Sequence, residues 1–343
     1  MKNYILLIVS AVAIAFTSCT SSEEIEINDT ISKYQAIFKI NPATVVEPFT
    51  WQAKPGELTT IDTSMKLRIR SLIYDNNGDI VTADTSFVSN YTTYVNFTTE
   101  LERGTYTVIV ISDIVQPNAD KNHVPEYWYL SNCDKLSQTK ISHAGYIGYE
   151  DEILGISSHT ISVSESNNEY KIDIKPAGAV IYTYYKNIDA WTDMKRYQLN
   201  ITQTVKEGVF DLNGNFNSSV ENHNNEYDWR LSVVYPEYSS ISSGYVISYV
   251  LPQNNLRVRF SGATYTGFNG DETGESYWFG EEQLLSAIKP GNEFVIKADF
   301  ADYGNDFGVG YEDVTGKTFT KSVSSNYDYL PPLIDSESFQ HLK

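Results

Sequence analysis

The sequence predicts an all-β protein. Tyr (26) and Phe (15) are abundant, Met (3) is scarce, and Thr, Ile and Val recur in short runs, which is the composition typical of strands. Several segments alternate apolar and polar residues with a period of two, and no segment shows a long amphipathic helical period. Asn-Gly pairs at 77–78 and 213–214 are strong local signals for tight hairpin turns.

The first residues are typical of a secretory signal. Lys2 precedes an apolar run from Ile5 to Phe16 that is shorter than the roughly 20 residues a membrane-spanning helix needs. Thr17 and Ser18 then precede Cys19. Small residues before a Cys at the end of such a run resemble a bacterial lipobox, although Phe16 stands where that pattern prefers an aliphatic residue. The alternative is an ordinary signal peptide whose cleavage region contains Cys19.

The lipobox resemblance implies that residues 1–18 are a lipoprotein signal peptide and that Cys19 is the lipid attachment site. We expect acyl chains, palmitate among them, on Cys19, because two or more chains hold a protein stably at a membrane. Residues 19–32 are polar and acidic and are expected to form a flexible tether. Cys133 is then the one remaining thiol, so no intramolecular disulfide is expected, and a lone Cys is usually a small buried apolar residue.

The length and charge of the chain indicate how many domains it has and which partners it excludes. The chain is longer than one hydrophobic core usually supports, so we expect two domains, at 33–168 and 169–321, followed by a polar tail at 322–343. The formal net charge is −19, and loss of Lys2 with the signal peptide makes it −20. Such a chain repels phosphate backbones, so nucleic acid is not an expected partner.

The first domain shows a clear order of expected strands. A strand is expected at Tyr34–Ile40, a hairpin at 67–81, an alternating segment at 91–97, and at 101–112 a strand that is apolar on both faces and therefore belongs inside a sandwich. In the hairpin we expect Leu67, Ile69 and Ile73 on one face and Arg68 and Arg70 on the other. Residues 113–169, rich in Asn, Asp, Ser and Gly, are interpreted as long excursions from this domain.

The second domain repeats the same kind of pattern. Alternation at Tyr170, Ile172 and Ile174 resumes the strands, and further strands are expected at 179–185, 197–201, 227–235, 245–251, 256–260 and 294–300. A similarity between ERGTYTVIV at 102–110 and KPGNEFVIK at 289–297 suggests an internal duplication, with each segment the late strand of its domain.

The sequence contains no motif of a familiar enzyme. It has no HExxH, GxSxG, P-loop or GxGxxG pattern, so we expect no enzyme, no catalytic residues and no cofactor. Oxygen-bearing residues follow calcium-loop spacing from Asp75 to Asp79 and from Asp211 to Asn215, but both segments lack the distal Glu of such a loop. A tight Asn-Gly hairpin explains both segments better, so no metal is expected.

Three features together suggest a family: the lipoprotein start, the hairpin LRIRSLIYDNNGDIV with the following ERGTYTVIV, and the later IKPGNEFVIKADF. In these features the chain resembles the fimbrillin-like family of type V pilus proteins, especially its lipid-anchored anchor and assembly subunits. The resemblance implies two tandem transthyretin-like, Greek-key β-sandwiches and a structural or adhesive role in a fimbria. It also implies an outer-membrane location facing the cell exterior, and pilus subunits as partners that join by donor-strand or edge-strand addition.

The same resemblance bears on the kind of subunit. Polymerising members of the family are cut after an Arg beyond the first strand, which opens a groove for a donor strand. This chain has no Arg between Cys19 and Arg68, and Arg68 lies inside a predicted strand. The departure favours an uncut, membrane-retained anchor that offers its own segment, either Thr318–Tyr329 or an open edge of the second domain, to a partner.

The alternative function is a surface lipoprotein that binds host or other glycans. Trp128 and Trp278, each flanked by aromatic residues, are the candidate contacts for sugar rings, together with Trp229. Packing of these aromatics in the sandwich cores is the simpler explanation, particularly for Trp229 within its alternating strand.

Overall fold

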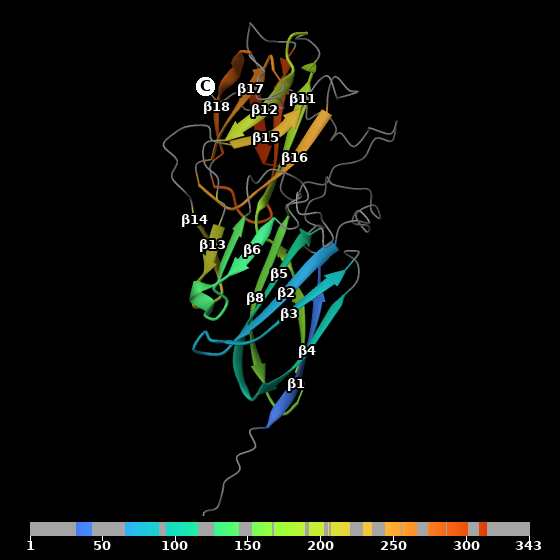
Figure 1. Ribbon diagram of the computed structural model, residues 1–343, viewed down its shortest axis with the longest axis vertical. Coiled ribbons are helices and arrows are strands. Elements are labelled where there is room, and N and C mark those ends of the chain that lie inside the picture. Colours follow the sequence, from blue (N-terminus) through green and yellow to red (C-terminus); the bar gives the residue numbers. More distant parts are fainter. Residues whose placement is uncertain are drawn as a thin grey trace, which may run out of the picture. The chain divides into compact units, whose positions relative to one another are not determined.

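The computed structural model describes residues 32–42, 66–88, 94–115, 127–143, 153–166, 168–188, 192–201, 205, 207–219, 229–234, 244–254, 256–265, 274–285, 287–300 and 309–313. These residues are organised in β-sheets, so the all-β prediction is confirmed (Figure 1). A short 3₁₀ helix, η2 (Leu136–Gln138), connects two of the strands. Within the described residues, no helix has the length and apolar character needed to cross a membrane.

The first repeat, residues 33–176, contains a three-stranded sheet and a five-stranded sheet. The three-stranded sheet has the order β4-β1-β9, in which β9 runs parallel to β1. The five-stranded sheet has the order β10-β8-β5-β2-β3 with antiparallel neighbours. The strands are β1 (Lys33–Asn41), β2 (Lys66–Tyr74), β3 (Ile80–Val88), β4 (Val95–Glu102), β5 (Gly104–Val115), β8 (Leu154–Val163), β9 (Glu169–Asp173) and β10 (Lys175–Pro176).

The second repeat, residues 179–313, contains two four-stranded sheets, with the orders β16-β11-β19-β20 and β15-β12-β17-β18. Its first strand, β11, lies between an antiparallel neighbour, β16, and a parallel late strand, β19. The strands are β11 (Ala179–Lys186), β12 (Arg196–Ile201), β15 (Trp229–Val234), β16 (Gly244–Val250), β17 (Leu256–Ala263), β18 (Ser276–Leu285), β19 (Glu293–Asp299) and β20 (Val309–Asp313).

The sheet orders establish the internal duplication. Of the strands given above for each repeat, the first lies between the fourth and the seventh, and the order β3-β2-β5-β8 of the first repeat recurs as β15-β12-β17-β18. The predicted equivalence of 102–110 and 289–297 is wrong in detail, because β5 corresponds by position to β17, whereas β19 corresponds to β9. A Gly before an aromatic residue is a local strand-entry signal and does not identify which strand follows.

A third sheet combines short strands from both repeats in the order β14-β13-β7-β6. Between β5 and β8 the chain forms β6 (Trp128–Ser131) and β7 (Lys140–His143), and between β12 and β15 it forms β13 (Glu207–Phe210) and β14 (Phe216–Ser219). Strand β13 pairs antiparallel with β7, with Gly208 opposite Ile141, and an ion pair joins Lys140 to Glu207. A hairpin of the second repeat thus extends a sheet that belongs to the first.

The third sheet explains why β2 and β5 are buried on both faces. Directly paired residues of neighbouring strands point to the same face, so the pairs Arg68–Asp113 and Leu72–Ile109 share one face. This face meets the third sheet, because Arg68 donates a hydrogen bond to the backbone of β6 and the β13–β14 turn lies against β5 and β8. The expectation that the strand at 101–112 runs through the interior is confirmed, since β5 is buried along most of its length.

Two predicted features need correction. Residues 113–169 were expected to be excursions, but β8 pairs with β5 from Gly104 opposite Val163 to Asp113 opposite Leu154. Its Ser and His residues hide the strand pattern. Ser157 is buried, and its Oγ donates a 2.6 Å hydrogen bond to the carbonyl of Asp173, whereas Ser158 and Ser162 are exposed. In addition, β9 and β10 lie beyond the predicted boundary at residue 168 but pair with β1 and β8 of the first repeat.

The buried apolar side chains of the described residues form two clusters. The first contains residues from β1, β2, β4, β5 and β8 together with Trp128, Phe210 and Tyr249. The second lies between the two sheets of the second repeat and includes Tyr197, Phe260, Phe279 and Phe300. Residues Phe210 and Tyr249 of the second repeat therefore contribute to the first core, and Tyr249 Oη donates a 2.8 Å hydrogen bond to the carbonyl of Leu154.

Candidate functional site

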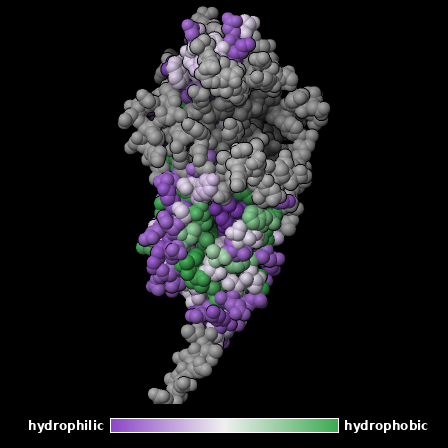
Figure 2. Space-filling view, in the orientation of Figure 1, coloured by the Kyte–Doolittle hydropathy of each residue, from purple (hydrophilic) through white to green (hydrophobic). Residues whose placement is uncertain are grey.

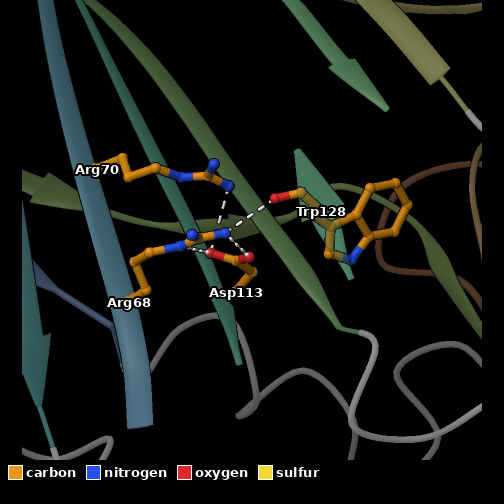
Figure 3. Close-up of polar contacts among 4 residues, drawn as sticks. All are labelled: Arg68, Arg70, Asp113 and Trp128. Atoms are coloured by element: carbon orange, nitrogen blue, oxygen red, sulfur yellow. Dashed lines mark hydrogen bonds and ion pairs between the residues drawn. The ribbon is translucent and has the colours of Figure 1, made fainter. Parts of the chain in front are cut away.

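A buried charged cluster joins β2, β5 and β6 on the side of β2 that faces the third sheet (Figure 3). Arg68 donates from Nε to Asp113 Oδ1 at 3.0 Å and from Nη2 to Asp113 Oδ2 at 2.6 Å. Arg70 Nη2 donates to Asp113 Oδ1 at 3.3 Å, and Arg68 Nη2 also donates to the carbonyl of Trp128 at 2.9 Å. One carboxylate thus holds two guanidinium groups.

Burial makes this cluster a strong structural constraint. The side chain of Asp113 is 0% exposed and that of Arg68 is 12% exposed. Taking these charges out of water is costly, and the cost is offset only by close, well-aligned contacts such as the two-point Arg68–Asp113 pair. Arg68, the first Arg after Cys19, is therefore held inside the protein on a paired strand.

Strand β1 is held equally firmly in the neighbouring sheet. It is hydrogen-bonded along both edges, to β4 and to β9, and Ala36, Phe38 and Ile40 are buried. The ring of Phe38 stacks on Phe97 at 5.5 Å and on Tyr170 at 5.4 Å between centroids. Release of β1 would expose this apolar row and break two ladders of backbone hydrogen bonds.

Cys133 lies near this cluster and is partly buried with a free thiol. Burial raises the pKa of the thiol, and the nearby positive charge of Arg70 opposes that shift. Close by, Tyr74 Oη and Thr139 Oγ1 are hydrogen-bonded at 2.7 Å, and burial raises the pKa of Tyr74 to about 12. The thiol is thus protonated at neutral pH, as expected for a packing residue rather than a nucleophile.

The two segments with calcium-loop spacing are hairpin turns capped by their own Asp residues. Asp75 Oδ1 accepts from the backbone N–H of Asn77 at 2.8 Å and of Asp79 at 2.9 Å. Asp211 Oδ1 accepts in the same way from the N–H groups of Asn213 and Asn215. The pKa of Asp75 is lowered chiefly by the backbone hydrogen bond from Asp79, and that of Asp211 chiefly by the side chain of Asn215. Among the described residues, no three His, Cys, Asp or Glu side chains gather as metal ligands.

The tryptophans considered for glycan binding differ sharply in exposure. Trp128 is 0% exposed, and its ring packs edge-on against His143 at 4.7 Å, so it cannot offer a surface to a sugar. Trp278 on β18 is 43% exposed, and the guanidinium of Arg259 lies 5.2 Å from its ring centroid. Trp229 begins β15. Cys19, tether residues 20–31 and the segment 318–343 lie outside the described residues.

Sequence reasoning missed the Arg68–Asp113 cluster as a unit. The alternation of Arg68 and Arg70 with apolar residues was visible, and Asp113 follows a long apolar run, which is itself unusual for a carboxylate. Only the register of β2 against β5 places Arg68 directly opposite Asp113.

No protein-family model matches this sequence, and no curated protein matches it. Among solved structures, the fold resembles the fimbrial anchor protein Mfa2 from Porphyromonas gingivalis, with 9% identity, a TM-score of 0.45, and coverage of 83% of this chain and 98% of Mfa2. The tip fimbrial protein Mfa3 from the same organism, in a C-terminally truncated form, shows 10% identity and a TM-score of 0.40 over 82% of this chain and 99% of its own. A candidate cell adhesion protein from Bacteroides ovatus ATCC 8483 shows 11% identity and a TM-score of 0.46 over 82% of this chain and 98% of its own. The solved structures that this chain resembles therefore include fimbrial anchor and tip proteins and a candidate adhesion protein.

Proposed function

We propose that this protein is a lipid-anchored subunit of a surface pilus that keeps its first strand and acts as an anchor or assembly subunit. The observation that supports the proposal is that β1 is paired and Arg68 is buried. Strand β1 is paired on both edges, and the first Arg beyond it is buried against Asp113. An Arg-specific protease that frees the first strand in polymerising subunits would find the first Arg beyond β1, Arg68, buried on a paired strand, so β1 stays in place. The proposal assigns no catalytic activity to the chain.

The test is limited digestion of the folded protein with an Arg-specific protease. Arg103 is the matched internal control, because it lies between β4 and β5 and its side chain is 73% exposed. We expect cleavage after Arg103 before any cleavage after Arg68, as followed by mass spectrometry of the early products. Early cleavage after Arg68 with release of the β1 peptide would instead identify a processed, polymerising subunit.

The membrane attachment is part of the same proposal and rests on Cys19 and the apolar run before it. We propose that Cys19 carries the lipid and holds the protein at the outer membrane, facing outward. In cells fed a labelled fatty acid, the Cys19→Ala variant should lose the label and leave the membrane fraction. A variant that keeps both would contradict the lipid assignment, and Cys133→Ala serves as the control that should change neither.

We propose that the pilus partner joins by strand addition, and β3 is the described edge best suited to receive it. Strand β3 ends the order β10-β8-β5-β2-β3, and it contains no Lys, Arg or Pro, residues that often protect such edges. Its side chains Val81 and Phe87 are 45% and 53% exposed. Figure 2 shows hydrophobic surface among hydrophilic residues on the first repeat. An exposed apolar edge of this kind can accept an extended segment through backbone hydrogen bonds.

Two variants compare β3 with the tail as the contact. Thr85→Pro in β3 should reduce the retention of pili on cells while the protein still reaches the membrane, because Pro cannot donate a ladder hydrogen bond. The control is Leu212→Lys, which changes an exposed side chain away from β3 and should leave pilus retention unchanged. Shedding of pili by a folded chain that lacks 318–343, with normal retention in Thr85→Pro, would assign the contact to the tail.

A further inference from the structure

Strand β3 carries a single charged residue, and this residue stands at the middle of the strand. β3 lies beside β2 at the end of the five-stranded sheet, so one of its two edges has no neighbour among the described strands (Figure 1). Its sequence is IVTADTSFV, in which Asp84 is the fifth of nine residues. Any strand that adds to this edge must therefore accommodate a carboxylate at its centre.

Asp84 lies on the inward face of this edge. It is paired with Ser71 of β2, and directly paired residues of neighbouring strands point to the same face. Ile69 and Ile73, two residues to either side of Ser71, are on that face and belong to the first core. Asp84 is accordingly half-buried, whereas its neighbour Thr85 is exposed.

The charge of Asp84 is not compensated by the described residues. Ser86 Oγ donates to Asp84 Oδ2 at 3.4 Å, which is long for a hydrogen bond to a carboxylate. Arg68 and Arg70 of β2 point to the other face of the sheet, where both contact Asp113. Within the part of the chain that the structure describes, no Lys or Arg forms an ion pair with Asp84. Because a half-buried charge is less screened than one in bulk water, it attracts a basic side chain that comes close.

The position of Asp84 disfavours pairing of β3 with a second copy of itself. Two β3 strands that pair antiparallel over their whole length place residue 80 opposite residue 88 of the copy. This register brings the exposed Val81 opposite the exposed Phe87, but it also places Asp84 directly opposite Asp84 of the copy. Like charges directly opposite destabilise a strand pair, whereas opposite charges stabilise it. Inward-pointing charges are one of the devices that protect natural sheet edges from such self-pairing.

We propose that Asp84 selects the strand that joins β3. The edge accepts an extended segment that places a Lys or Arg opposite Asp84 and apolar residues opposite Val81 and Phe87, and it disfavours a second copy of β3. This inference rests on the proposed addition of a partner strand at β3, and it adds the charge that the partner must carry.

The test compares two peptides as probes for the chain without residues 1–19. One peptide has the β3 sequence IVTADTSFV, and the other, IVTAKTSFV, has Lys in place of the central Asp. Both carry the same uncharged flanks and a fluorophore. Fluorescence anisotropy should show that the chain binds the Lys peptide at least about fivefold more tightly, because one cross-strand charge pair changes from repulsive to attractive. The preference should disappear in Asp84→Asn and reverse in Asp84→Lys.

Glu165→Lys is the matched control, because it changes the net charge as much as Asp84→Lys does but at an exposed position outside β3. It should keep the preference for the Lys peptide, which separates the contact at residue 84 from the overall charge of the chain. Circular dichroism of each variant checks that the fold is retained.

The possible failures of the two proposals are distinguishable. Equal binding of both peptides by the wild type would overturn the selection by Asp84 and leave strand addition at β3 standing. A preference for the Lys peptide that persists in both Asp84 variants would also overturn the selection. Binding of neither peptide would overturn the selection and the proposed acceptor edge together.

Discussion

At the scale of single residues, Asp113 is the carboxylate that accepts hydrogen bonds from both Arg68 and Arg70. It neutralises Arg68 and lies within hydrogen-bond distance of Arg70, and its carboxylate is fully buried. Asp113→Asn keeps the shape but removes the negative charge that faces the two buried guanidinium groups. We expect a loss of about 3–5 kcal/mol in the free energy of unfolding, the range for breaking a buried ion pair, as measured by urea denaturation.

The matched control for Asp113 is an ion pair on the surface. Arg103 and Glu165 lie 3.9 Å apart with both side chains about three-quarters exposed, so Glu165→Gln should change the stability by less than about 1 kcal/mol. Similar effects of the two substitutions would mean that the buried cluster contributes no more than a surface pair.

At the scale of elements, the β13–β14 hairpin depends on Gly214. This residue has φ of +78°, and an added Cβ would meet Ser158 Oγ of β8 and lie 3.1 Å from Thr107 Cγ2 of β5. Gly291 has a similar φ of +75° but open space around the same position. Gly291→Ala should therefore cost only the backbone strain of about 1–2 kcal/mol, and Gly214→Ala should cost measurably more in thermal unfolding.

A double variant separates the contact from the backbone strain at this turn. Ser158→Ala removes the Oγ that a Cβ on Gly214 would meet, so Gly214→Ala should be less costly in that background than in the wild type. The contact would be ruled out if Gly214→Ala lowered the stability equally in the Ser158→Ala and wild-type backgrounds, and by no more than Gly291→Ala does. The hairpin would then not be in tight contact with β5 and β8 at this position.

At the scale of the whole molecule, the two repeats are connected by strand pairing as well as by the covalent chain. Strand β9 lies after the polar stretch at 164–169 but pairs with β1, and the hairpin 207–219 pairs with β7. A chain nicked at residue 167 should therefore elute as one species in size-exclusion chromatography and separate only in denaturant. Independent elution of two folded fragments would instead support the boundary at 168 that the sequence suggested.

The sequence by itself determined the all-β class, most strand positions and the two Asn-Gly hairpins. Each of these depends on a local signal: alternation reports one buried face, and Asn-Gly reports a turn that needs positive φ. Gly78 and Gly214 indeed have φ of +75° and +78°. The Tyr197–Ile201 and Leu256–Phe260 segments also became strands where their alternation predicted them.

Only the tertiary structure decided which strands meet and what covers them. Arg68 faces Asp113 because of a register between segments 45 residues apart, and no local pattern records such a register. Strand β8 was missed because polar residues interrupt its apolar alternation. Buried Ser157 is satisfied by its hydrogen bond to Asp173, so that position did not require an apolar residue, and Ser158 and Ser162 are exposed. Likewise, β2 and β5 lost their solvent-facing side because the third sheet, assembled from both repeats, covers it. The physical reason is the same in each case: burial and pairing depend on distant partners, whereas the sequence pattern reports only the preference of each segment.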